Sequence, residues 1–380
     1  MGRTRFLIVI LLLLGGLLPA HAQAEVVRVM LQSPALADNA LGLPDQRELT
    51  IYLPPGYARS DHRRYPVLYL LHGFTSEPIE WFDGSYQGLD LAAALDAQAA
   101  AGKTEYIVVI PEANNPMGGS FYVNSRAFGR WDDFISHDVV AFIDSHYRTR
   151  ADRLHRGIAG QSMGGFGALS LAGRHPDLFA HVYALSPYGL DMSGELAEDN
   201  PVWRAMNKPA SEWPANVPPG LVKIVKVEAA AFAPAGEVNL GPVQALPYRV
   251  LRTGLPAVDA RVMAAWHAQL PLYRLQANPA PYRQLADIVI EYGTLDAIAN
   301  VRLGSAAFID ALHVAGIPVV VRTFNGGHVD HARDSFEQRL LPYFADLFGK
   351  PTAHAPRDQA EAAGIPTRPP VAPAPLPHAR

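Results

Sequence analysis

The sequence predicts an α/β fold in which a mostly parallel central sheet is covered by helices on both faces. Short apolar runs of strand length alternate with longer segments of helical spacing along most of the chain, which is typical of parallel strands joined by helices. A glycine-flanked serine, Gly160-Gln161-Ser162-Met163-Gly164, stands between one such run and one such helix. The long irregular stretch 187–282 interrupts this order, and we predict that it is an inserted, cap-like segment.

Local patterns place the elements along the chain. Residues 25–31 and 48–53 are predicted to form strands at an antiparallel edge, the second ending at Pro54-Pro55-Gly56. The continuous apolar run 67–71 is expected of a strand buried on both faces. Further strands are predicted at 106–110, 181–185, 288–292 and 319–324, and helices at 89–101, 131–147, from Ser162 to before His175, at 306–315 and at 335–348.

The two ends of the chain are predicted to lie outside this domain, which then occupies residues 25–350. Residues 1–24 resemble a secretory signal peptide, because Arg3 and Arg5 precede an apolar run that is short for a membrane span and small residues follow it. An uncleaved anchor is the alternative. Residues 351–380 are rich in proline and alanine, which predicts a disordered tail. We therefore expect an exported protein, periplasmic or secreted, without stable membrane insertion after signal cleavage.

Composition excludes several classes of function. The net charge is −4 and no basic run occurs, so nothing points to nucleic acid as a partner. The chain has no cysteine, which excludes disulfides, thiolate metal sites, a cysteine nucleophile and a lipoprotein anchor. Hydrophobic residues make up 49% of the chain, enough for a sizeable core. The oligomeric state stays open.

Ser162 has the sequence context of a catalytic nucleophile. In the pattern G-x-S-x-G, a serine on a sharp strand-to-helix turn is exposed at the edge of the sheet, and the turn requires neighbours without bulk. Gly160 and Gly164 meet this requirement, and Gly165 and Gly167 allow the following helix to pack close to the sheet. The alternative is a glycine-rich structural turn.

A serine nucleophile needs a base, and the base needs an acid that orients it. Asp296 and His328 are the candidates, since each follows a predicted strand and the order serine, acid, histidine is that of doubly wound hydrolases. His331 is the rival base, and Asp330 and Asp334 are the rival acids. The same four residues from His328 to Asp334 could also be taken for a metal cluster, but they lack the spacing of a helical metal motif. We expect no metal and no cofactor.

The transition state also needs hydrogen-bond donors for its oxyanion, each contributing about 3 kcal/mol. The backbone N–H groups of Met163, directly after the serine, and of Phe74, in the turn after the third strand, are the predicted donors. His72 is expected to form internal hydrogen bonds. The aromatic side chains predicted to line the substrate pocket are those of Trp81, Tyr122 and Tyr188.

These residues lie in motifs through which the chain resembles the esterase D–like family of α/β-hydrolases. The motifs are Leu70-Leu71-His72-Gly73-Phe74, the segment 119–125, the segment 131–135, and above all residues 158–168 around Ser162. The family includes S-formylglutathione hydrolases, feruloyl and acetylxylan esterases, enterochelin esterases and mycolyltransferases. The resemblance covers about 47–189 and 285–348, and it implies an α/β-hydrolase fold.

The resemblance assigns Ser162 as nucleophile, Asp296 as acid and His328 as base, with Phe74 and Met163 as oxyanion donors. The chain departs from the family where substrate would bind: Val329-Asp330-His331-Ala332 stands where tryptophans often follow the histidine, and the segment before Leu285 is longer. We expect a serine carboxylesterase for short acyl, aryl or acylated sugar esters. An acyltransferase to a sugar or lipid alcohol would use the same residues, and a non-catalytic binding protein on this scaffold is a further alternative.

Overall fold

The computed structural model describes residues 24–206, 208–234, 245–251 and 256–350. The predicted tail and, apart from Ala24, the predicted signal peptide lie outside the described residues. Within those described ranges, no helix is long and apolar enough to span a membrane.

An eight-stranded sheet with the order β1-β2-β4-β3-β7-β8-β11-β12 forms the centre of the fold. Strand β2 is antiparallel to β1 and to β4, and the remaining neighbours are parallel. The predicted mostly parallel sheet with an antiparallel edge is therefore confirmed. The strands are β1 (Glu25–Gln32), β2 (Gln46–Leu53), β3 (Val67–Leu71), β4 (Ile107–Pro111), β7 (Arg156–Gln161), β8 (His181–Leu185), β11 (Asp287–Gly293) and β12 (Val320–Phe324), with the short pair β5 (Asn124–Ser125) and β6 (Gly129–Arg130) outside the sheet.

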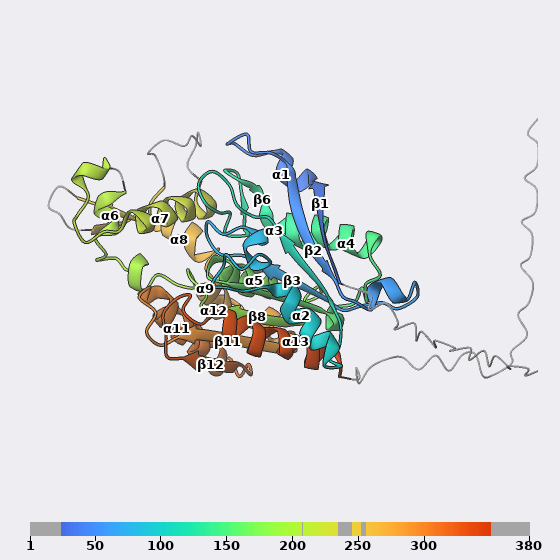
Figure 1. Ribbon diagram of the computed structural model, residues 1–380. Helices are drawn as coiled ribbons and strands as arrows, with labels where there is room; N and C mark the ends of the chain where they lie inside the picture. The colour runs from blue at the N-terminus through green and yellow to red at the C-terminus, as the bar shows by residue number, and fades with distance from the viewer. Residues whose placement is uncertain (1–23, 207, 235–244, 252–255, 351–380) are drawn as a thin grey trace, which may run out of the picture. The chain divides into compact units, whose positions relative to one another are not determined.

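Helices cover both faces of the sheet (Figure 1). Side chains of a strand point alternately to opposite faces, so Leu68 and Leu70 of β3 pack with α2 and α13, whereas Tyr69 and Leu71 pack with α4, α5 and α11. The helices are α1 (Pro34–Ala37), α2 (Leu91–Ala100), α3 (Trp131–Asp133), α4 (Val140–His146), α5 (Met163–Arg174), α11 (Ala299–Val314), α12 (Ala332–Ser335) and α13 (Leu341–Phe348), with π-helical turns η3 (Phe134–Val139) and η7 (Phe336–Leu340) and 3₁₀ turns η1 (Tyr57–Arg59), η2 (Pro78–Trp81) and η4 (Arg153–His155).

Three predicted helices differ in detail. The helix expected over 335–348 is divided into the end of α12, the π-helical turn η7 and α13. The segment expected to be one helix over 131–147 consists of α3, η3 and α4, with one π-helical turn in the middle. The helix expected at 306–315 begins at Ala299, because Glu195 accepts hydrogen bonds from the first amides of α11 at 2.9 Å and 2.8 Å. This partner lies far away in sequence, so no local pattern reveals it.

Residues 187–282, hereafter the cap segment, share the hydrophobic core of the sheet's α5 side. Phe232 connects the two parts, since its ring stacks on Phe166 of α5 at 5.7 Å and meets Trp266 edge-on at 5.3 Å. Helices α6, α7 and α8 lie together (Figure 1). The elements of the cap segment are η5 (Gly194–Leu196), α6 (Val202–Ala205), η6 (Ala210–Glu212), α7 (Pro219–Phe232), β9 (Tyr248–Val250), β10 (Pro256–Val258), α8 (Ala260–His267), α9 (Pro271–Ala277) and α10 (Ala280–Arg283).

The strand order reverses at β3. From β3 the chain moves outward to β4, and it then returns to place β7 on the other side of β3. In open α/β sheets the loops at such a switch point diverge and leave a crevice at the carboxyl ends of the strands. Here those loops carry His72-Gly73-Phe74 and Ser162.

Candidate active site

Ser162 sits between β7 and α5 with a left-handed backbone, φ 58° and ψ −118°. Such a conformation is strained for a residue with a side chain and persists only where its surroundings hold it. Two hydrogen bonds hold this turn: the N–H of Ser162 donates to the carbonyl of Leu185 at 2.9 Å, and the N–H of Tyr188 donates to the carbonyl of Ser162 at 3.2 Å. The hydroxyl of Ser162 does not cap α5, which leaves it available for chemistry.

The glycines flanking Ser162 are required by close backbone contacts. A Cβ on Gly164 would collide with the carbonyl of Leu71, and one on Gly160 would collide with the carbonyl of Gly164. The turn therefore tolerates no side chain at either position, as expected for the strand-turn-helix geometry of a nucleophile elbow.

His328 and Asp296 lie in direct contact although they are far apart in sequence. Nδ1 of His328 lies 2.7 Å from Oδ2 of Asp296, whose side chain is 0% exposed while that of His328 is 20% exposed. The other oxygen of Asp296 accepts a hydrogen bond from the N–H of Ile298 at 2.9 Å. The buried carboxylate thus fixes the proton of the imidazole on Nδ1 and leaves Nε2 as the basic nitrogen.

The rival residues have other partners. His331 pairs with Asp334 at 3.5 Å and its side chain is 41% exposed, and Asp330 accepts a hydrogen bond from the N–H of Gly327 at 2.7 Å. Neither arrangement reaches Asp296. Among the described residues, no group of three or more His, Cys, Asp or Glu side chains could hold a metal ion.

The side chains of Ser162, His328 and Asp296 do not form a continuous hydrogen-bonded chain in this structure. In the described part of the chain, no hydrogen bond links the hydroxyl of Ser162 to His328, and the contact between His328 and Asp296 is the one formed. Catalytic hydrogen bonds are often long before substrate binds. Ser162 and His328 are nevertheless connected through Gln161, the residue directly before Ser162. The side chain of Gln161 donates a hydrogen bond to the carbonyl of His328 at 3.2 Å.

The two predicted oxyanion donors belong to neighbouring backbone segments. A Cβ on Gly119 would lie 2.5 Å from Sδ of Met163 and 3.1 Å from the ring of Phe74, so these two residues meet around this glycine. A Cβ on Gly73 would lie 3.6 Å from Cβ of Ser162, so the turn after β3 lies next to this serine. The N–H of Met163 also belongs to the first turn of α5, where backbone N–H groups lack helical acceptors.

His72 lies in this turn and forms the internal hydrogen bonds predicted from the sequence. Its Nε2 accepts a hydrogen bond from the N–H of Ala113 at 2.9 Å, and its Nδ1 lies 2.9 Å from the carbonyl of Gly73. Burial lowers the pKa of His72 to about 4. The ring is therefore neutral, and its hydrogen bonds stabilise the turn that carries Phe74.

Ser162 opens into a cleft of about 730 Å³. Most of its wall comes from the cap segment, and Phe74, Thr75, Ala297 and Ile298 close the sides nearest the sheet. The residues contributed by the cap segment are Tyr188, Glu195, Asn200, Pro201, Asn216, Pro218, Gly220, Leu221, Lys223 and Ile224. A cavity of this size accommodates a substrate larger than a short acyl group alone.

The predicted aromatic pocket needs correction at two of its three positions. Tyr188 lines the cleft, but Trp81 and Tyr122 are 0% exposed and lie outside its lining. The hydroxyl of Tyr122 donates to the carbonyl of His72 at 2.9 Å, and Trp81 packs against Phe336 at 4.9 Å. Both side chains belong to the hydrophobic core, Tyr122 on the α5 side of the sheet and Trp81 of η2 on the α2 and α13 side.

Two residues near the site carry no signal in the sequence. Gln161 occupies a variable position of the G-x-S-x-G pattern, so nothing marks its side chain as a contact of His328. Glu228 of α7 is 0% exposed, and its carboxyl interacts with the side chain of Tyr188. Burial raises the pKa of Glu228 well above its usual value. A glutamate in a run of apolar residues gives no indication of which side chains will surround it.

Comparison with known families gives one match that extends over most of the chain. Residues 41–347 match the family described as "Putative esterase". An esterase of Mycobacterium tuberculosis is 31% identical over 175 residues, which are 41% of this chain and 36% of that protein. An endo-1,4-beta-xylanase/feruloyl esterase of Xylanibacter ruminicola is 28% identical over 158 residues, or 40% of this chain and 21% of that protein. The matched regions thus span about a third or less of these relatives.

Solved structures share the fold over nearly their whole length. A ferulic acid esterase has a TM-score of 0.57 at 24% identity, covering 86% of this chain and 99% of its own. An S-formylglutathione hydrolase from Agrobacterium tumefaciens has a TM-score of 0.56 at 18% identity, covering 86% and 97%. These likenesses show the α/β-hydrolase fold.

Proposed function

Because the chain belongs to the esterase family whose model it matches, we propose that it is a serine carboxylesterase that works through an acyl-enzyme, with Ser162 as nucleophile. The observation that carries the proposal is the contact between His328 and the buried carboxylate of Asp296 beside a strained serine turn. A lone histidine or serine is common, but this ordered set on three strand ends serves no evident packing purpose.

In the proposed reaction, Oγ of Ser162 attacks the ester carbonyl while Nε2 of His328 accepts its proton. The carbonyl oxygen becomes an oxyanion, which the N–H groups of Phe74 and Met163 stabilise. His328 then returns the proton to the leaving alcohol as the carbon–oxygen bond breaks. Water repeats the sequence on the acyl-enzyme and releases the acid, with Asp296 holding the imidazole in place throughout.

We propose aryl or acylated sugar esters as the preferred substrates. The cleft is large, and its wall combines apolar groups such as Ile224 and Leu221 with the amides of Asn200 and Asn216. Such a surface suits a ring that carries hydroxyl groups better than a plain alkyl chain. The feruloyl esterase activity in the name of the Xylanibacter ruminicola relative supports the same choice.

We further propose that the protein is exported. The support is the predicted signal peptide over residues 1–24. Mass spectrometry of the N-terminus of protein from a periplasmic extract and from culture medium tests this, with cleavage after Ala22 or Ala24 expected.

The enzymatic proposal is tested with Ser162→Ala. We expect this variant to lose hydrolysis of p-nitrophenyl acetate and of feruloyl and acetylated-sugar esters, because no other group can form the acyl-enzyme, while its melting temperature stays close to that of the parent. A fluorophosphonate probe should label the parent and not the variant. Turnover that survives in Ser162→Ala would remove Ser162 from its role.

A further inference from the structure

The side chain of Gln161 bridges two segments that meet beside the nucleophile. Its Nε2 donates to the carbonyl of His328 at 3.2 Å, and its Oε1 accepts a hydrogen bond from the hydroxyl of Tyr86. Gln161 is 2% exposed and is the last residue of β7, directly before Ser162. The amide group therefore links the strand that presents the nucleophile to the loop that presents the base.

Tyr86 is itself held firmly. Its N–H donates to the carbonyl of Glu80 at 3.1 Å, and its carbonyl accepts from the N–H of Leu89 at 2.9 Å. Its ring lies 5.9 Å from that of Trp81, which packs against Phe336 at 4.9 Å. Trp81 thus has a place in this arrangement although it does not line the cleft: it supports the residue that fixes the oxygen end of Gln161.

The loop that carries His328 has few other attachments to the sheet. The N–H of Leu295 donates to the carbonyl of Gly326 at 3.0 Å, and the side chain of His328 reaches Asp296. Other hydrogen bonds of the loop lie within it, among them those from the N–H of Gly327 to Asp330 at 2.7 Å and from the N–H of Ala332 to the carbonyl of Val329 at 3.0 Å. Both attachments to the sheet come from the β11 side. Gln161 supplies the attachment on the β7 side, where the nucleophile is.

We propose that Gln161 is a positioning residue that sets the distance between the imidazole of His328 and the hydroxyl of Ser162, with Tyr86 fixing the orientation of its amide. This proposal rests on the proposed serine esterase function. Asp296 controls the tautomer and rotation of the imidazole, whereas Gln161 controls where its backbone stands relative to β7. Loss of the bridge would leave the base attached on one side only.

The expected consequence is a loss in the chemical steps, acylation among them, and not in substrate binding. Gln161 is absent from the lining of the cleft, so substrate binding does not require it. A displacement of about 1 Å in a catalytic group can cost about 100-fold in rate. We therefore expect Gln161→Met, which keeps the length but removes both hydrogen bonds, to lower the single-turnover acylation rate about 10- to 100-fold with an unchanged substrate dissociation constant.

Two further variants separate positioning from general stability. Tyr86→Phe removes one hydroxyl and should lower acylation less than Gln161→Met does. In the double variant the effects should not add, because both changes act through the same amide. The downfield proton resonance of the hydrogen bond between His328 and Asp296 should broaden in Gln161→Met if the loop has lost its attachment.

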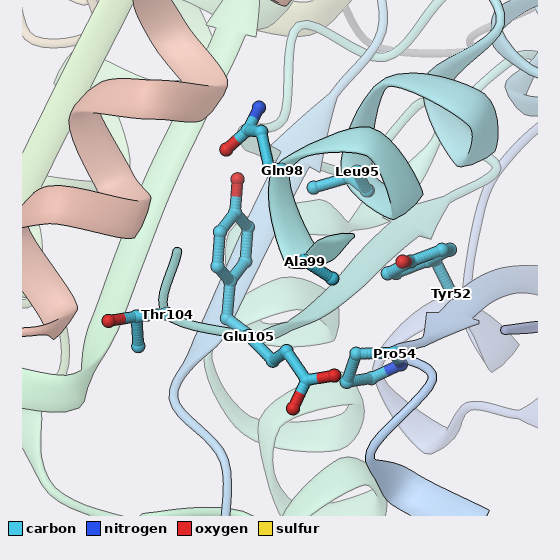
Figure 2. A pocket seen from close by; sticks show the side chains of 8 residues that line it. Tyr52, Pro54, Leu95, Gln98, Ala99, Thr104 and Glu105 are labelled. Atoms are coloured by element: carbon cyan, nitrogen blue, oxygen red, sulfur yellow. The ribbon is translucent and has the colours of Figure 1, made fainter. Parts of the chain in front are cut away.

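Matched controls come from a second pocket, shown in Figure 2, which shares no residue with the Ser162 cleft. Gln98 of α2 is half-buried there and its amide atoms have no hydrogen-bond partner, while Tyr52 donates its hydroxyl to Asp96 at 2.7 Å. Gln98→Leu replaces a glutamine amide by an apolar group, and Tyr52→Phe removes a hydrogen-bonded hydroxyl, both away from the site, so both should keep the parent's acylation rate.

The experiment compares the parent and these five variants by stopped-flow acylation with p-nitrophenyl acetate and by thermal melting. A selective loss of acylation in Gln161→Met, with a melting temperature no lower than that of the controls, supports the proposal. Parent-like acylation in Gln161→Met overturns it, as does a loss shared equally with Gln98→Leu. If Ser162→Ala also retains turnover, the esterase function itself fails, so the two failures are distinguishable.

Discussion

Both oxygens of the Asp296 carboxylate are occupied, one by Nδ1 of His328 at 2.7 Å and the other by the N–H of Ile298 at 2.9 Å. A carboxylate held at two points cannot rotate away from the imidazole. Arg302 adds a third restraint, since its Nε donates to the backbone carbonyl of Asp296 at 2.8 Å. The carboxylate of Asp296 is therefore fixed next to the imidazole of His328.

This arrangement predicts the effect of Asp296→Asn. The amide cannot accept both hydrogen bonds, and by donating to Nδ1 it would force the imidazole proton onto Nε2. We expect kcat for p-nitrophenyl acetate to fall about 10³- to 10⁴-fold with little change in folding. Asp334→Asn, at the partner of His331, is the control and should retain activity. If Asp334→Asn loses as much activity as Asp296→Asn, the roles of acid and base must be reassigned to Asp334 and His331.

The close contacts of the serine turn predict a steep difference between two glycines. Gly164→Ala places a methyl group against the carbonyl of Leu71, so we expect a loss of about 3 kcal/mol or more in unfolding free energy, or no folded protein. Gly220 of α7 has no atom within 4 Å of its Cβ position, and Gly220→Ala should stabilise by about 0.5 kcal/mol. Urea titrations measure both. Equal stability of the two variants would contradict the turn geometry.

His72 predicts a loss of stability in acid. Its folded-state pKa is lowered to about 4 by burial, so between the unfolded value of about 6.5 and that pKa the unfolded chain binds a proton that the folded protein does not. The ionisation of His72 leaves the unfolding free energy at its full value above about pH 6.5, and it lowers this free energy by about 2 kcal/mol between pH 7 and pH 5. His72→Gln should flatten this part of the profile. A slope identical to the parent's in urea titrations at several pH values would rule out the assignment.

Glu228 predicts the opposite dependence. Burial raises its pKa well above the usual value, so the folded protein keeps a proton that the unfolded chain releases above about pH 4.3. Stability therefore falls as pH rises, by about 1.4 kcal/mol per pH unit until the folded-state pKa is reached. Glu228→Gln, which cannot ionise, should be more stable than the parent at pH 8 and similar at pH 4. Glu337→Gln, at an exposed ion pair with Arg333, should show no such difference.

Much of the sheet could be predicted from the sequence because its strands are continuous apolar runs. The run 67–71 coincides with β3, and the predicted strands at 181–185 and 319–324 match β8 and β12 to within a residue. The cap segment could not be resolved in this way. The second half of its helix α7 is buried at every position from Val227 to Phe232, so the helical period that one-sided burial would produce is lost there.

The site, like the fold, could be predicted from the sequence only in part. Ser162, Asp296 and His328 follow strands directly, and strand ends can be located from sequence. The substrate pocket could not be predicted, because the direction of an aromatic side chain in a loop depends on tertiary contacts: Tyr122 turns inward to His72 while Tyr188 faces the cleft. The bridge through Gln161 depends on Tyr86 and His328, which lie on separate loops, and no pattern within one segment can indicate it.

Helix α11 starts on the cap segment's Glu195, and Asn300 in its first turn also accepts a hydrogen bond from the N–H of Gly189 at 2.7 Å. The loop that holds Asp296 leads directly into this helix. Exchanging the cap segment for that of another esterase, in order to graft a new specificity, would therefore disturb Asp296, the proposed catalytic acid, as well as the wall of the cleft. A chimaera must carry Gly189, Glu195 and Asn300 together, so that selectivity can be transplanted while the catalytic machinery stays aligned.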